Sequence, residues 1–244
     1  MLAAAVAAAS AWPASHAAAQ DYPDRLIKLV VPFPPGGAAD IPARILAQRL
    51  SIVLGQTVII DNRPGASGAV GVKSVIGAAP DGYTLLFGNA SSLTILPSLL
   101  KNAGYDPAKN FAPIAKVTEG YEVLVVDPAS PARTLAELIA YARANPGKLN
   151  YASLGHGNLT HLAAELLKLR TGIDIVHVPY KGTADAVTAL LGGQVQMMFG
   201  DVAGLLPLAR DGRVRALAVA SSTRSALAPD LPTFAEAACP ISSR

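Results

Sequence analysis

The chain has 244 residues, of which 51% are hydrophobic and 15% are charged, and its formal net charge at pH 7 is +3. This composition is that of a folded protein with a large core, and it excludes a disordered chain. The basic residues form no cluster of the kind that nucleic acid binding requires, and the single cysteine, Cys239, excludes an intramolecular disulfide and a thiolate metal cluster.

Residues 1–19 predict a secretory signal peptide. They contain an alanine-rich apolar run that ends in three alanines, Ala17 to Ala19. Such a run before an A-x-A site is typical of a signal peptide, so we expect export and cleavage after Ala19. A membrane span needs roughly 20 apolar residues, and this run is shorter and contains Pro13. A disordered alanine-rich terminus is the alternative.

Residues 26–87 predict a β-α-β-α-β unit. Leu26 to Val31 is apolar except for Lys28, which is typical of a strand buried on both faces. Apolar residues then follow one helical face from Ile41 to Leu54, with Asp40 as the expected N-cap. Further strands are expected at 57–60 and 83–87, with a helix through Val72 to Ile76 between them. This order implies a parallel sheet with right-handed crossovers.

A second α/β series follows residues 101–120, which show no helical period and are expected to be a connection. Thr134 and Glu137 form a capping box before a helix from Leu135 to Ala144, which Pro146 and Gly147 end. Strand, glycine-containing loop and helix then recur twice. The other expected strands of this series are 123–126, a strand ending in Asp201, and 214–220. The fold class is therefore α/β.

Four loops join a strand to the start of a helix and contain glycine: 34–40, 88–92, 155–160 and 179–184. The first N–H groups of a helix have no partner within the helix, so an anion placed there receives several hydrogen bonds. Ligands of open α/β sheets bind at this edge of the sheet. Ordinary turn chemistry is the alternative for each loop, but four such loops favour a binding site.

No short motif predicts an enzyme. Residues 155–160, "GHGNLT", lack the third glycine of a dinucleotide fingerprint, and Asp174 stands at the wrong end of its strand to bind a ribose. A hydrolase could use His156 or His161 with Asp201. However, His161 at a helix start more often stabilises a turn, His177 in an apolar strand is more often a core histidine, and Asp201 could simply cap the helix after it.

Longer stretches resemble a known family. They include "YPDRLIKLVVPFPPGGAADIPAR", "LGQTVIIDNRPGASGAVG", "APDGYTLLFGN" and "VHVPYKGTADAVTALLGGQVQMMF", and the likeness runs in order from Tyr22 to about Ala235. In these stretches the chain resembles the Bug-type periplasmic receptors of tripartite tricarboxylate transporters.

The resemblance implies an α/β clamshell of the type II periplasmic-binding class. Lobe two would comprise residues 122–220. Lobe one would comprise residues 20–121 and 221–244. Family members continue past "LPTFAEA", so lobe one is expected to be incomplete. The chain also departs from the family at Ala39, where a hydroxyl residue is usual, and at Leu159, which interrupts a polar run.

The family's function is to bind a small carboxylate (a dicarboxylate, tricarboxylate, amino acid or aromatic acid) and deliver it to membrane components of the transporter. The resemblance therefore implies a monomeric, periplasmic receptor that is not an enzyme and uses no cofactor or metal. A hydrolase using His156 or His161 with Asp201 is the rival. The expected ligand-binding residues are Pro35, Gly36, Gly37, Ala38, Asp40, Asn89, Ser91, Gly157, Asn158, Thr160, His161, Tyr180, Lys181 and Asp201.

Overall fold

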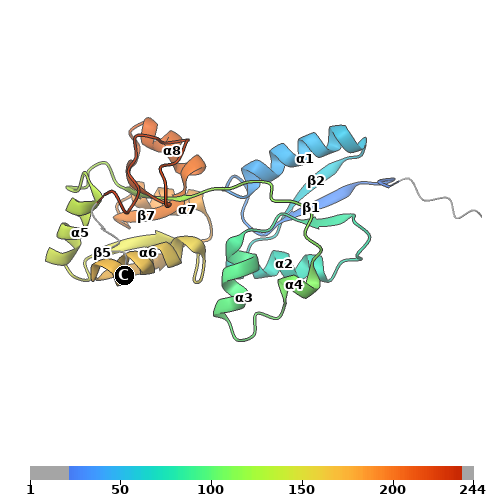
Figure 1. The fold of residues 1–244 in the computed structure, drawn as a ribbon, viewed down its shortest axis with the longest axis horizontal. Helices are drawn as coiled ribbons and strands as arrows, with labels where there is room; N and C mark the ends of the chain where they lie inside the picture. The colour runs from blue at the N-terminus through green and yellow to red at the C-terminus, as the bar shows by residue number, and fades with distance from the viewer. Residues whose placement is uncertain (1–21, 238–244) are drawn as a thin grey trace, which may run out of the picture.

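A computed structural model describes residues 22–237, and within it two separate sheets each form the centre of one lobe. Residues 111–121 run without helix or strand from the first lobe to the second (Figure 1). We use "lobe one" for the part with the three-stranded sheet and "lobe two" for the part with the five-stranded sheet. The α/β class with two lobes expected from the sequence is confirmed.

Lobe one contains the β-α-β-α-β unit. Its sheet has the order β2-β1-β3, and both pairs are parallel, as predicted. Helix α1 covers one face of this sheet, and α2 lies on the other (Figure 1). The central strand β1 is apolar because it is covered on both sides. The elements are β1 (Ile27–Val31), α1 (Asp40–Leu54), β2 (Val58–Asn62), α2 (Ala69–Ile76), β3 (Thr84–Leu86), α3 (Leu96–Leu99) and α4 (Pro107–Asn110), with a 3-10 turn at Ala66–Gly68 and a π-helical turn at Ser91–Ile95.

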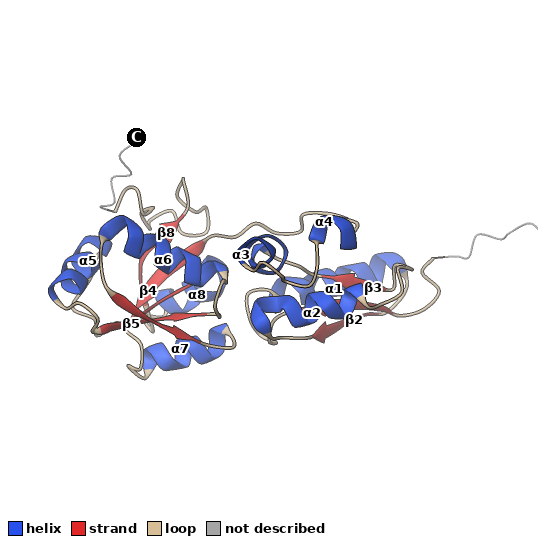
Figure 2. Ribbon diagram, turned by 90° about the horizontal axis from the view of Figure 1, so that it is seen from below, coloured by secondary structure: helices blue, strands red, loops and turns tan. Residues whose placement is uncertain are grey.

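Lobe two has a mixed sheet of order β6-β5-β7-β4-β8. The strands β6, β5 and β7 are parallel, whereas β4 runs antiparallel to both β7 and β8. Helices α5 and α6 pack on one face, and α7 and α8 pack on the other (Figure 2). The elements are β4 (Glu122–Val126), α5 (Leu135–Ala144), β5 (Leu149–Ser153), α6 (Leu159–Thr171), β6 (Ile175–Pro179), α7 (Thr183–Leu191), β7 (Met197–Asp201), α8 (Val202–Arg210) and β8 (Arg215–Ala220).

The segment after β8 lies on lobe two, whereas we expected residues 221–244 to return to lobe one. Val219 and Thr233 form a parallel bridge, and the ring of Phe234 stacks on Phe199 of β7 at 5.8 Å. The apolar side chains of this segment thus cover the β8 edge of the lobe-two sheet. The expectation from the family had assigned the segment to lobe one. The expected signal peptide and residues 238–244 lie outside the described part of the chain.

The predicted elements are present with small shifts at their ends. The α5 helix begins and ends at the predicted residues, and Glu137 accepts a hydrogen bond from the Arg133 N–H, one residue before the cap Thr134. The connection 101–120 contains one short helix, α4, that we did not predict. None of the helices in residues 22–237 has the length and apolar character that crossing a bilayer would need.

Candidate functional site

A cavity of about 530 Å³ lies between the two lobes. All four of the glycine-containing loops line it, together with Lys116, Thr118, Glu119 and Gly120 of the connection and Glu122 at the start of β4. Its volume falls in the range of small-molecule binding sites, which are about 300–1,000 Å³. The edge of each sheet where helices begin therefore faces a shared cavity.

The loop before α1 is held by the carboxylate of Asp40. This side chain is buried, and its oxygens accept hydrogen bonds from the Gly36 N–H at 2.8 Å, from Arg44 Nε at 2.7 Å and from Asn62 Nδ2 at 2.9 Å. Burial alone would raise the pKa of Asp40, but the hydrogen bonds from Arg44, Gly36 and Asn62 outweigh it and hold the pKa below its ordinary value. Asp40 therefore holds the loop in place against α1 and β2.

Asp40 is not the N-cap that we predicted. Ala39 holds that position, with helical backbone angles and no side-chain hydrogen bond, and Asp40 is the first residue of α1. The carboxylate turns back over the loop because three donors converge on it there, and they satisfy it better than one helix N–H would.

The N–H groups of Gly37, Ala38 and Ala39 point to a function of the loop. These three residues line the cavity. Among the hydrogen bonds found within residues 22–237, the N–H of Gly36 is used by Asp40, but the three N–H groups that follow it are not used. Unused amides at a helix N-terminus, in a cavity, are donors for an anion.

The two lobes touch on either side of the cavity. On one side Leu159 N donates to Ser91 Oγ at 3.1 Å, and Ser67 Oγ donates to the His156 carbonyl at 2.7 Å. On the other side, Gly182 lies so close to Pro34 that a Cβ added to the glycine would sit 3.1 Å from a ring carbon. These contacts hold the two lobes against each other beside the cavity.

Four acidic residues line the cavity on the side of the connection and lobe two: Glu119, Glu122, Asp185 and Asp201. Glu119 is exposed and pairs with Lys116 at 2.8 Å. Glu122 and Asp201 stand opposite each other on β4 and β7. The Oε2 atom of Glu122 is buried and has no hydrogen-bond partner within the described residues. Burial first, and the charge of Asp201 second, raise the pKa of Glu122 to about 8, so this carboxyl group is mostly protonated at neutral pH.

Asp201 caps α8, one of the two roles between which the sequence left a choice, and it also lines the cavity. One oxygen, Oδ1, caps α8 by accepting from the Ala203 N–H at 2.9 Å. The other, Oδ2, lies next to Gly120, where an added Cβ would come within 2.6 Å of it, and the residue lines the cavity. Burial raises the pKa of Asp201, and the hydrogen bonds from the Ala203 and Gly204 N–H groups oppose that rise.

The expected ligand-binding residues divide into two groups. Those that line the cavity are Pro35, Gly37, Ala38, Asn89, Ser91, Asn158, Lys181 and Asp201. Those that do not are Gly36, Asp40, Gly157, Thr160, His161 and Tyr180. Several of the second group support the loops: Asn158 Oδ1 accepts from the Thr160 N–H at 3.0 Å, and His161 Nδ1 accepts from the Gly157 N–H at 3.2 Å.

The sequence did not point to the part of the cavity lined by residues 116–122. Glu119 belongs to the connection, which shows no helical period, and Glu122 directly precedes the predicted strand 123–126, so no pattern marked either residue as part of a site. Phe33, Pro34 and Thr183 also line the cavity but were not among the expected ligand-binding residues, although Pro34 and Thr183 lie in two of the four predicted loops. The charged residues of a connection between two lobes would have been the only available signal.

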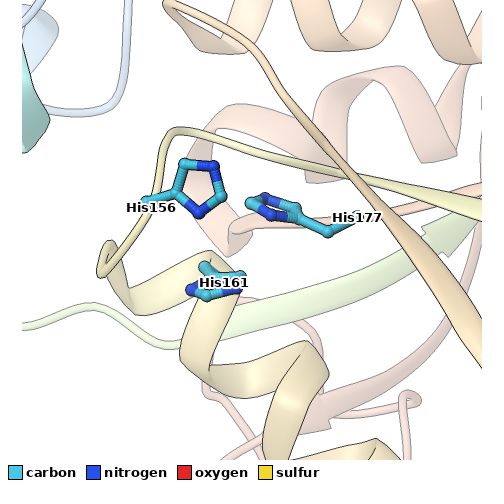
Figure 3. Close-up of side chains that lie close together, drawn as sticks. All are labelled: His156, His161 and His177. Carbon is cyan, nitrogen blue, oxygen red and sulfur yellow. The ribbon is translucent and has the colours of Figure 1, made fainter.

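Three histidines meet next to, but outside, the lining of the cavity (Figure 3). His156 comes from the loop before α6, His161 from the first turn of α6, and His177 from β6. One ring nitrogen of each lies within 4.8 Å of those of the other two. His177 Nε2 lies 2.5 Å from Ser153 Oγ, and the residue is half-buried, whereas the sequence favoured a core histidine.

Comparison with known proteins gives consistent matches along the chain. The family model described as "Tripartite tricarboxylate transporter family receptor" matches residues 42–242. Protein BugT of Bordetella pertussis is 41% identical over 233 residues, which are 95% of this chain and 72% of that protein. A solved structure of R. palustris Rpa4515 with adipate is 38% identical with a TM-score of 0.86, and the match covers 90% of this chain and 74% of that one. MatC from Rhodopseudomonas palustris with bound malate is 35% identical with a TM-score of 0.84, at the same coverage.

Proposed function

Since the chain belongs to the family of tripartite tricarboxylate transporter receptors, we propose that it is a periplasmic receptor for a small carboxylate, which it delivers to the membrane components of such a transporter. The observation that carries this proposal is the cavity between the lobes, which the unused N–H groups of Gly37, Ala38 and Ala39 line. A carboxylate accepts several N–H bonds at once, and the positive end of the α1 dipole favours its charge. Adipate and malate, which two relatives bind, are ligands of this class.

We place one carboxylate of the ligand at the amides before α1, with Lys181 beside it as the basic side chain from lobe two. The acidic side of the cavity would disfavour a second ionised group unless Glu122 is protonated and donates to it. A ligand hydroxyl or ammonium group there would instead find an acceptor in Asp201. This end of the cavity therefore accepts one of two ligand groups. The first is a second carboxylate that is hydrogen-bonded to protonated Glu122, and the second is a hydrogen-bond donor that binds Asp201.

The rival function, hydrolysis by His156 or His161 with Asp201, has less support. Asp201 lines the cavity, but neither histidine does. A general base has to reach the reacting group directly or through one water. The matching family model is described as that of a receptor, and two of the solved relatives hold a carboxylate, so we favour binding without turnover.

Isothermal titration calorimetry against a panel of acids tests the proposal. The panel contains malate, adipate, citrate, aspartate, benzoate and, as an uncharged control, malate diamide. We expect binding of one molecule per chain for at least one acid, no binding of the diamide, and no product on chromatography of the mixture. Hydrolytic release from ester substrates without stoichiometric binding of any acid would overturn the proposal.

Two substitutions at one glycine test the amide cradle. Gly37→Pro removes a donor and fixes φ, so we expect it to abolish binding of the acid that binds most tightly in the panel. Gly37→Ala keeps the N–H, and its added Cβ would lie at an ordinary 3.5 Å from the Pro34 carbonyl oxygen, so it should bind nearly as well as the wild type. Lys181→Ala should cost only about 1–2 kcal/mol of binding free energy. Loss of binding in Lys181→Ala with retention in Gly37→Pro would contradict the cradle.

A further inference from the structure

We propose that His156, His161 and His177 form a binding site for a divalent transition metal ion such as Zn²⁺, on lobe two beside the ligand cavity. The chain has four histidines, and the three within the described residues all meet at this one place (Figure 3). Three imidazoles with a water in the fourth position are a donor set that zinc accepts in proteins. Sequence spacing gave no hint of the site, because the three ligands come from a loop, a helix and a strand.

The distances require only a local adjustment. In a tetrahedral zinc site the ligand nitrogens lie about 3.4 Å apart, since each Zn–N bond is about 2.1 Å. Here the three nitrogens lie within 4.8 Å of one another. The rings of His161 and His177 are stacked at 4.2 Å with an angle of 28° between their planes, while the ring of His156 stands at 74° and 89° to them. Rotation about the soft χ2 torsions is needed before all three lone pairs converge. His161 must also release the hydrogen bond that its Nδ1 accepts from the Gly157 N–H, because a neutral imidazole has one lone pair to offer.

One contact favours His177 as a ligand. Ser153 Oγ lies 2.5 Å from Nε2 of His177. In the tautomer that carries its proton on Nε2, His177 donates a hydrogen bond to Ser153 Oγ and presents Nδ1 to a metal.

The position of the site connects it with the cavity. His156 is exposed, two residues before Asn158, which lines the cavity. The His156 carbonyl also accepts the hydrogen bond from Ser67 of lobe one. A metal ion held by His156, His161 and His177 would therefore join the loop 154–158 to β6 and restrict the loop that touches lobe one.

Zinc titration of the full chain, carrying no histidine tag and freed of metal with a chelator, tests the proposal. Calorimetry with ZnCl2 at about pH 7.5 should show one ion per chain, and Co²⁺ should give the visible absorption of a tetrahedral site. We expect His156→Ala and His161→Gln each to weaken zinc binding by at least about tenfold, and Ser153→Ala to weaken it by about tenfold. His156 is exposed, so His156→Ala should not disturb folding.

Arg170→Gln is the matched control, because it changes a basic side chain in the last turn of α6 without removing a ligand, and its zinc affinity should equal that of the wild type. An adventitious ion only, seen as zinc binding that survives the double variant His156→Ala/His161→Gln unchanged, would overturn the proposal. So would the absence of stoichiometric binding in the wild type. Neither result depends on carboxylate binding, so it leaves the proposed function untouched.

Discussion

Glu122 is a carboxyl group placed where its ionised form is disfavoured, since it is largely buried and faces Asp201 across the β4–β7 pair. With a pKa of about 8 it should lend a proton to a bound carboxylate at neutral pH. Glu122→Gln keeps a neutral group of the same shape. We therefore expect calorimetry on the tightest-binding acid of the panel to give similar affinities for both proteins at pH 6, and several-fold weaker binding for the wild type at pH 9.

The same group should appear in the pH dependence of stability. The pKa of Glu122 is raised in the folded state. Its contribution to the free energy of unfolding is therefore fully present below its ordinary pKa of 4.5 and is lost as the pH rises through about 8. Urea unfolding should show the wild type losing stability relative to Glu122→Gln over that window, with a constant difference above it. Parallel curves from pH 4 to pH 9 would contradict the raised pKa.

Single residues were the hardest feature to predict from the sequence. Asp40 was correctly expected to act at the start of α1, but its role as cap was wrong because Arg44 and Asn62 compete for the same carboxylate. Asn62 lies on β2, and no local pattern brings it to the loop. Glu122 gave no signal because its burial depends on the packing of a β4–β7 pair that forms only in the folded lobe.

At the scale of the element, Asn158 at the start of α6 has two roles, and two substitutions of this residue separate them. Asn158 caps the helix by accepting from the Thr160 N–H, and it also lines the cavity. Asn158→Ala should lower stability by about 1 kcal/mol through the lost cap. Asn158→Asp keeps the cap, and the helix dipole tolerates its charge, so thermal melting should resemble that of the wild type while carboxylate affinity falls by at least tenfold through repulsion.

Thr134→Ala on α5 is the control for this comparison. It removes a cap of similar strength, because Thr134 Oγ1 accepts from the Glu137 N–H, but Thr134 does not line the cavity. It should lower the melting temperature and leave carboxylate binding unchanged. If Asn158→Asp binds the panel acids as well as the wild type does, Asn158 does not face the ligand carboxylate.

Elements were predicted well because each rests on a local signal. Capping and the Pro146–Gly147 stop fixed α5, and continuous apolar runs marked β1 and β4. The antiparallel direction of β4 was not predicted, since an apolar run looks the same in either direction. Nor was the position of residues 221–237, whose packing on Phe199 and Val219 is a tertiary choice between two available sheets.

At the scale of the whole molecule, the two lobes differ in how well their cores are covered. The sheet of lobe two has five strands with a core cluster on each face. Lobe one has three strands, of which β3 has only three residues, and Ile52 and Val53 of α1 are 69% and 81% exposed. Lower burial of apolar surface means lower local stability. Hydrogen exchange should therefore be slower in β4, β5 and β7 than in β2 and β3.

Ligand should change this pattern in both lobes together, because the cavity has donors on each side and exists only where the lobes meet. Adding the tightest-binding acid of the panel at saturation should slow exchange at residues 37–39 of lobe one and at 157–160 of lobe two. Amides of α5, far from the cavity, are the internal control and should keep their rates. The Gly37→Pro variant should show neither change. Slowing confined to one lobe would mean that the acid binds to that lobe alone, and a site shared between the lobes would then be excluded.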